Sequence, residues 1–305
     1  MHAALLTACL FALTGLCANQ SSRLLGGARA NFWRLITAVL LLAIWAHGFG
    51  GGFGGGVLAW FCLAGGIGFG LGGWCVFQAL RRIGSTLTLL LVECAAAVFA
   101  TAIAWIWLDA ALRPVEILAV LAILTGIFAG TTPAPIPNLA APAIARGCAL
   151  ALAAGLFQAI SFNLSRHAFL LMRDLEGGIG PLTAAYQRLL GGLCVAALLH
   201  ALTRWLAPRI PVRAPAPPTW SSPLPAPAWV LLNALFGPVL GVSCMLWAIS
   251  LVENPGLVQA VAATATLLTV PLARHLEHAR PGRNYYLGSL LALIGTSVLL
   301  VFTQE

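Results

Sequence analysis

The stretch TLTLLLVECAAAVFATAIAWIW, from Thr86 to Trp107, carries one charged residue, Glu93, in an otherwise almost wholly apolar run. An apolar run of this length with few charges is typical of a helix that crosses a membrane. A carboxyl group inside such a helix costs on the order of 2.5–3.5 kcal/mol on insertion scales, so it must face protein or water. We therefore expect Glu93 to point into a helical bundle rather than toward lipid.

The rest of the chain has the same character. Of its 305 residues, 60% are hydrophobic and 8% are charged, whereas a soluble domain usually carries about 25% charged residues. This composition predicts an all-α polytopic membrane protein without a sizeable soluble domain. Ten transmembrane helices are expected, at about 3–19, 32–47, 57–80, 86–108, 115–131, 146–165, 183–203, 227–250, 256–274 and 285–303.

The net charge of +8 comes from arginine alone, because the chain contains no lysine. The arginines flank the apolar runs as singles or pairs, which is typical of membrane anchoring and topology signals. Without a basic block, no nucleic-acid partner is expected. Because CxxC, HExxH and Walker motifs are missing, we expect no metal, no cofactor and no ATPase, and we interpret the His275–His278 segment as a solvated cluster.

A proline-rich linker at 132–145 divides the chain into two halves of five spans, at residues 1–131 and 146–305. Proline removes backbone donors, so such a segment belongs outside the bilayer. Since five is an odd number, the second half must enter the membrane in the opposite orientation to the first. This predicts an inverted-topology repeat, an architecture in which secondary transporters bind substrate near the midplane.

Short motifs recur at corresponding positions of the two halves. An arginine opens the second and seventh runs, and an acidic residue followed by a proline closes the fourth and ninth. The matched pairs are Trp33-Arg34-Leu35 with Gln187-Arg188-Leu189, Gly72…Cys75…Ala79 with Gly241…Cys244…Ala248, and Asp109…Pro114 with Glu277…Pro281.

With these duplicated motifs, essentially the whole chain resembles the drug/metabolite transporter superfamily, specifically the ten-helix EamA-type permeases. The resemblance implies a helical bundle around a central cavity, with helices one, three, four, six, eight and nine lining the path and helices five and ten packed behind. The chain departs from the family in helix four, where residues 93–97 lack the usual proline. Helix nine keeps a proline, Pro271.

Glu93 is the leading candidate for binding a substrate amine or coupling a proton, and the alternative is a neutral carboxyl bonded to a neighbour. Buried amides can contact a polar substrate or join helices to one another. Deep tryptophans can wall a cavity or pack the core. The further candidates for substrate binding or proton coupling are Asn19, Trp74, Gln78, Gln158, Asn163, Trp247 and Gln259.

Arg34 and Arg188 are expected at the mouths of equivalent helices, on opposite faces of the membrane. We expect them to anchor these helices at headgroups or backbone carbonyls, with gating as the alternative. Most other arginines fall in the odd-numbered loops, so the positive-inside rule places those loops in the cytoplasm. The family resemblance instead implies cytoplasmic termini, so the two indications disagree.

The sequence favours a secondary active transporter, most simply an exporter of amino acids or related metabolites that works by alternating access and proton exchange. We expect a multi-pass protein of the inner (plasma) membrane, monomeric or homodimeric, whose partners are a small-molecule substrate and the lipid bilayer. The alternatives are a flippase for a lipid-linked or amphipathic molecule, a membrane-embedded enzyme, and a non-transporting assembly or sensor protein.

Overall fold

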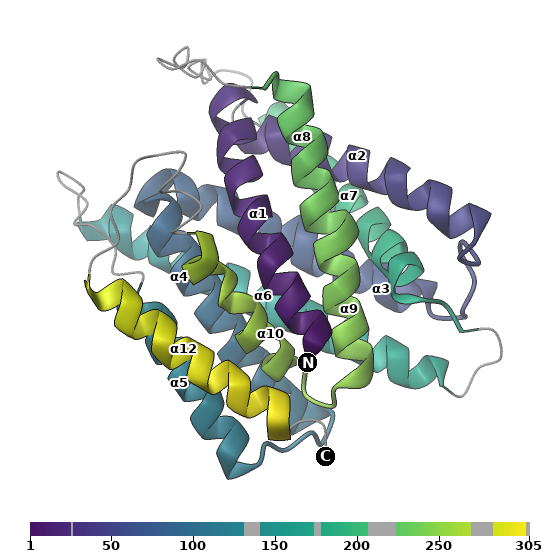
Figure 1. Ribbon diagram of the computed structural model, residues 1–305. Coiled ribbons are helices and arrows are strands. Elements are labelled where there is room, and N and C mark those ends of the chain that lie inside the picture. Colours follow the sequence, from purple (N-terminus) through teal and green to yellow (C-terminus); the bar gives the residue numbers. More distant parts are fainter. Residues whose placement is uncertain (26, 131–140, 174–177, 207–223, 270–282, 303–305) are drawn as a thin grey trace.

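The computed structural model describes residues 1–25, 27–130, 141–173, 178–206, 224–269 and 283–302, except the side chains of residues 19, 23, 27, 28, 80, 81, 84–86, 143 and 203–206. Their regular structure is entirely helical, which confirms the predicted all-α class (Figure 1). The helices are α1 (His2–Leu25), α2 (Gly27–Gly48), α3 (Leu58–Gly65), the π-helical η1 (Gly66–Gly72), α4 (Gly73–Trp107), α5 (Pro114–Gly130), α6 (Ala141–Met172), α7 (Pro181–Leu206), α8 (Ala226–Ala234), the π-helical η2 (Leu235–Gly241), α9 (Val242–Leu251), α10 (Pro255–Ala263) and α12 (Arg283–Phe302).

Among the described residues, eight helical segments are long and apolar enough to cross a membrane. Two shorter apolar helices, Pro114–Gly130 and Pro255–Thr269, fall on the predicted fifth and ninth spans. Large apolar side chains lie exposed on the outside, as at Ile44 and Ile106, where a soluble protein would place polar residues. These features make the chain a multi-pass membrane protein.

The helix assignment continues without interruption from α3 through η1 into α4, yet α4 reverses its direction within its length. Gly72 and Val92 both approach the 154–155 turn of α6, whereas Ile83, between them in sequence, lies beside Gly147, about two turns away along α6. A straight helix could not make both contacts. The segments Leu58–Ala79 and Leu87–Trp107 are therefore two antiparallel helical segments, and each is long and apolar enough to be a membrane span.

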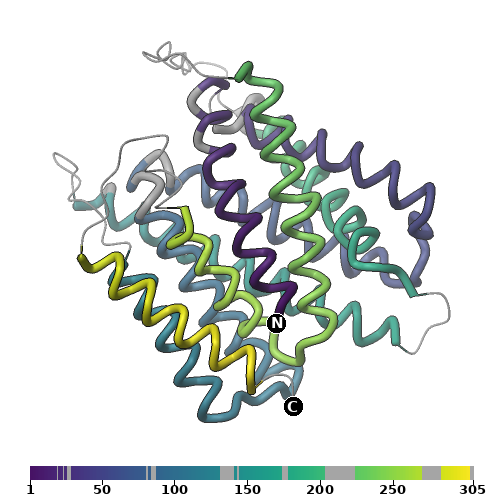
Figure 2. Tube along the Cα trace, viewed as in Figure 1, coloured from purple at the N-terminus to yellow at the C-terminus, as the bar shows by residue number. Residues whose placement is uncertain are grey.

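Helices from the first and last parts of the chain pack side by side. In Figures 1 and 2, α1 runs beside α8 and α9, and α5 runs beside α12 at one edge. The second pair approaches closely because Gly126 meets the backbone of Gly288 and Ala292. Small residues at such contacts let membrane helices pack backbone to backbone.

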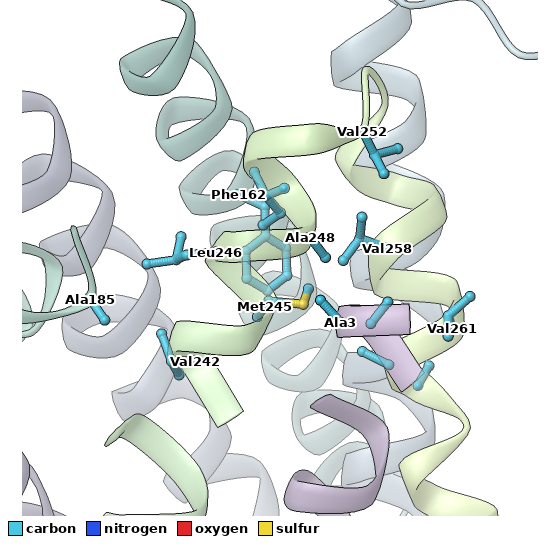
Figure 3. Close-up of a cluster of buried hydrophobic side chains, with 14 of the residues drawn as sticks. Ala3, Phe162, Ala185, Val242, Met245, Leu246, Ala248, Val252, Val258 and Val261 are labelled. Carbon is cyan, nitrogen blue, oxygen red and sulfur yellow. The ribbon is translucent and has the colours of Figure 1, made fainter. Parts of the chain in front are cut away.

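A buried apolar cluster fills the region between α6, α9 and α10. Figure 3 shows Phe162 beside Met245, Ala248 and Val258, and all four side chains are at most 4% exposed. This cluster borders the polar groups described below.

The glycine-rich segment after α2 is fixed against α7. Gln187 is fully buried, and its Nε2 donates to the carbonyls of Gly52 (3.1 Å) and Gly54 (3.0 Å). Thr183 donates to the Gly50 carbonyl at 2.8 Å. Gly52 has a φ of 56°, which favours glycine, so the loop needs glycine for its shape as well as for its contacts.

Candidate functional site

Glu93 on α4 and Gln259 on α10 meet inside the helical bundle. The Gln259 Nε2 donates to the Glu93 Oε2 at 2.6 Å, and the Gln259 side chain is fully buried. The Gln259 Oε1 is also buried, and it has no partner among the described residues. The pair thus combines a carboxyl group, which can carry a charge or a proton, with an amide that retains an unused acceptor.

The backbone explains why these two helices come so close. Gly256, one turn before Gln259, packs against Thr101 of α4 so tightly that a side chain at that position would overlap it. Asn254 caps α10 by accepting from the Gly256 N–H at 2.9 Å, and it donates to the Ala110 carbonyl, also at 2.9 Å. The cap and the glycine together fix α10 against the end of α4.

Arg188 on α7 is the second buried polar group, and only 2% of its surface is exposed. Its Nη2 donates to the Ser161 Oγ on α6 at 2.7 Å. Its guanidinium carbon lies 5.3 Å from the ring centroid of Phe69 on η1 and 5.1 Å from that of Phe162 on α6. The Nε and Nη1 groups are buried without a partner among the described residues.

Glycines place this arginine. A side chain at Gly65 of α3 would overlap the backbone of Arg188, and one at Gly191 would overlap the backbone of Cys62. The α3 and α7 backbones are therefore in contact, and a third glycine, Gly68, faces Ser161. Gly68 belongs to the GxGxxG pattern at residues 68–73, which lies within helical segments and serves helix packing rather than a dinucleotide loop.

Arg34 lies in a different environment from Arg188. Both arginines occur two turns into their helices rather than at the mouths predicted from the sequence, because α2 and α7 begin at Gly27 and Pro181. The Nη2 of Arg34 donates to Asn31 of the same helix at 2.7 Å. Anchoring at headgroups does not describe Arg188, since its guanidinium is enclosed by other helices.

Two predicted amides lie on α6. Asn163 is fully buried and donates to the carbonyls of Ala100 (3.1 Å) and Ala159 (3.0 Å), which joins α6 to α4. This is the interhelical hydrogen bonding considered above as the alternative to substrate contact. Gln158 is half-buried one turn before Phe162. The side chain of Asn19 lies outside the described part of the chain.

The two predicted tryptophans lie on the surface of the protein: Trp74 is 41% exposed and Trp247 is 49% exposed. Gln78 accepts from the Arg82 Nη1 at 2.9 Å through its side chain. Their described contacts do not join these three residues to Glu93, Gln259 or Arg188. An open depression between α4 and α6 is lined by Trp74, Gln78, Arg82, Arg146, Ala149 and Leu150.

The site residues predicted from the sequence did not include Ser161, Asn254 or Arg166, although each has defined polar partners in the structure. The Asn254-Pro255 pair carries a usable signal, because asparagine before proline is typical of a helix start. Arg166 donates to the carbonyls of Ile249 (3.1 Å) and Ser250 (2.7 Å) at the end of α9. No local pattern links Ser161 to Arg188. The His275–His278 segment lies outside the described residues.

Comparisons with known proteins agree with this architecture. A family model described as the EamA-like transporter family matches residues 1–131 and 145–301. A solved structure titled "Crystal structure of protein" is 20% identical, covers 99% of this chain and 98% of its own, and has a TM-score of 0.64, so the two share a fold. A search of curated proteins gave no match.

Proposed function

The chain belongs to the EamA-like transporter family of the drug/metabolite transporter superfamily, and we propose that it is a secondary active transporter that exports amino acids or related metabolites. Members of the family are transporters rather than enzymes, which implies a small-molecule substrate in a lipid bilayer. We assign the protein to the inner (plasma) membrane. The Glu93–Gln259 pair carries this proposal, because a carboxyl group and an amide meet within apolar helices.

In this proposal, ten spans form two inverted repeats, at residues 1–131 and 146–305, joined by the linker at 132–145. The two π-helical segments support the repeat, because they end at matched positions of the two halves. η1 ends at Gly72 and η2 ends at Gly241, and these are the first glycines of the matched motifs. The packing supports it as well, since α1 lies along α8, η2 and α9 while α6 lies along α3, η1 and α4.

Contacts between loops also support ten passes. Thr183 at the start of α7 binds Gly50 after α2, and Asn254 before α10 binds Ala110 after α4. Ten passes place all four of these connections on the same face of the membrane. In Figure 1 the start of α1 and the end of α12 lie toward the same side of the bundle, as an even number of spans requires.

The proposed mechanism uses the position of the pair. Glu93 and Gln259 belong to the fourth and ninth spans, one from each repeat, so a rocking of the repeats changes their separation. A substrate ammonium group can replace the Gln259 amide at the Glu93 carboxylate in one conformation. When the substrate leaves in the other, a proton can neutralise the same carboxylate, which couples export to proton entry.

The test is transport by the purified protein in liposomes. We expect uptake of at least one member of a panel of labelled amino acids, accelerated when an imposed pH gradient drives protons in the opposite direction. Protein-free liposomes and liposomes without a gradient are the controls. If no member of the panel enters in either condition, amino-acid transport is wrong.

The depression between α4 and α6 favours a second candidate, a flippase for an amphipathic molecule. It is open, and its lining combines two arginines, Arg82 and Arg146, with the exposed ring of Trp74. Arginines beside an aromatic side chain suit an anionic headgroup at the membrane interface. Movement of fluorescent lipids between leaflets in the same liposomes would support this candidate, and its absence alongside amino-acid uptake would exclude it.

A further inference from the structure

We propose that Arg188 binds the carboxylate of the transported molecule. This inference rests on the proposed function and extends it: the substrates are carboxylic acids, such as zwitterionic amino acids, rather than simple amines. It rests on the surroundings of the guanidinium, which lies 2% exposed between η1, α6 and α7.

The Arg188 guanidinium has hydrogen-bond donors without described acceptors. A guanidinium carries five N–H groups in a planar fork, and the described partner of Arg188 is one hydroxyl, the Ser161 Oγ at 2.7 Å. Nε and Nη1 are buried without an acceptor in the described part of the chain. Because Ser161 uses a single Nη2 hydrogen, one edge of the guanidinium keeps two parallel N–H groups, the arrangement that a carboxylate binds in bidentate fashion.

The buried positive charge of Arg188 has no described anionic partner. A buried cation is costly unless it is paired with an anion or fully hydrogen-bonded. Two carboxyl groups within the described helices have other partners: Glu93 accepts from Gln259, and Glu116 accepts from the Arg113 backbone N–H. The rings of Phe69 and Phe162 attract the guanidinium through their faces, but they offer no acceptor. An anionic substrate would supply the missing partner.

Apolar side chains lie between the surroundings of Arg188 and those of Gln259. Phe162, which covers one side of the guanidinium, belongs to the buried cluster with Val258 (Figure 3), and Val258 precedes Gln259. Side chains of one buried apolar cluster therefore lie beside the Arg188 guanidinium and next to Gln259 in the sequence. A molecule with a carboxylate, an apolar body and an amine matches this order of cation, apolar surface and carboxyl group.

The matched arginine of the first half, Arg34, differs in its described side-chain partner, although its Nε is also buried without a partner among the described residues. Arg34, the matched residue of the first half, donates to Asn31 within its own helix. Arg34 therefore serves as a control: it is an arginine in an equivalent helix whose described contact is local.

The experiment compares Arg188→Gln and Arg188→Lys with Arg34→Gln in detergent and in liposomes. The probes are the standard amino acids and their α-amides, which keep the amine and side chain but remove the carboxylate charge. Thermal stabilisation reports binding and labelled uptake reports transport. For the wild type and Arg34→Gln we expect an acid to bind about tenfold or more tightly than its amide, the preference expected of a charge-assisted pair.

Arg188→Gln should bind the acid and the amide equally, and Arg188→Lys should retain part of the preference, because an ammonium keeps the charge but loses the fork. If Arg188→Gln does not fold, Ser161→Ala gives the same test: it leaves the charge in place and should reduce the preference. An unchanged preference in folded variants, or a wild type that binds amides as well as acids, overturns this inference and leaves transport standing. If no probe binds or moves, the proposed function fails and the inference fails with it.

Discussion

At the scale of single residues, the polar side chains of this protein divide into those with complete hydrogen bonding and those with groups left over. Asn254 belongs to the first kind, because its amide donates to the Ala110 carbonyl and its Oδ1 accepts from the Gly256 N–H. Asn163 donates to two carbonyls, but its Oδ1, like atoms of Gln259 and Arg188, is buried without a described partner. Buried polar groups in proteins are almost always satisfied, and in the proposals above the substrate supplies the missing partners of Glu93, Gln259 and Arg188.

Asn254 should be a residue of stability rather than of transport. Asn254→Ala removes the cap of α10, worth about 0.5–2 kcal/mol, and leaves the Ala110 carbonyl without its donor, which adds about 1–3 kcal/mol. We expect a lower free energy of unfolding in detergent, measured by denaturant titration. Ser297→Ala is the control, because that exposed hydroxyl binds only within its own helix. Equal stability of the two variants would contradict the capping role.

Part of the candidate site could be predicted from the sequence. The position of Glu93 in an apolar run predicted that it faces protein, and it does. Its partner could not be predicted, because Gln259 lies 166 residues away and the pairing depends on how two helices approach. The exposure of Trp74 and Trp247 could not be predicted either, since a rotation of the helix decides which face meets the bundle.

At the scale of helices, close contact between backbones determines the architecture. Hydropathy predicted ten spans, and eight of them coincide with described helical segments that are long and apolar enough to cross a membrane. The π-helical segments η1 and η2 have no such signal in the sequence. They depend on tertiary packing, as π-helical segments generally do, and such segments are frequent at functional sites. The sequence predicted a boundary between two apolar runs at the position where α4 reverses. It did not predict that the helix continues through this boundary.

Two glycines provide a matched test of backbone contact. Gly191→Ala would place a methyl group against the Cys62 carbonyl of α3, whereas Gly73→Ala meets nothing within 4 Å. We expect Gly191→Ala to lower the yield of folded protein sharply. Gly73→Ala should be neutral or stabilise by up to about 0.5–1 kcal/mol, because alanine favours a helix. Size-exclusion profiles and thermal unfolding measure both, and similar behaviour of the two variants would refute the contact.

At the scale of the whole molecule, the account requires ten passes, with even-numbered connections on one face and the linker on the other. The linker lies on the same face as the other odd-numbered connections, which carry most of the arginines. The positive-inside rule places that face in the cytoplasm. The sequence predicted this layout from the duplicated motifs, but it could not predict which faces the termini occupy, because charge bias and family resemblance disagree.

Labelling of single cysteines tests the layout. In a background without the native cysteines, Ala111→Cys and Gly178→Cys should react with an impermeant maleimide from one side of the membrane. Ala134→Cys in the linker should react only from the other side. Labelling of all three from the same side would rule out the ten-pass arrangement.

The central claim is that Glu93 exchanges a proton for substrate. The most direct measurement is proton movement, followed with a pH-sensitive dye in liposomes while a transported amino acid moves down its gradient. Glu116→Gln is the matched control, because Glu116 is also buried but accepts from the Arg113 N–H at the start of α5. The account predicts protons moving opposite to substrate in the wild type and in Glu116→Gln, and substrate exchange without proton movement in Glu93→Gln. Proton movement that persists unchanged in Glu93→Gln would contradict it.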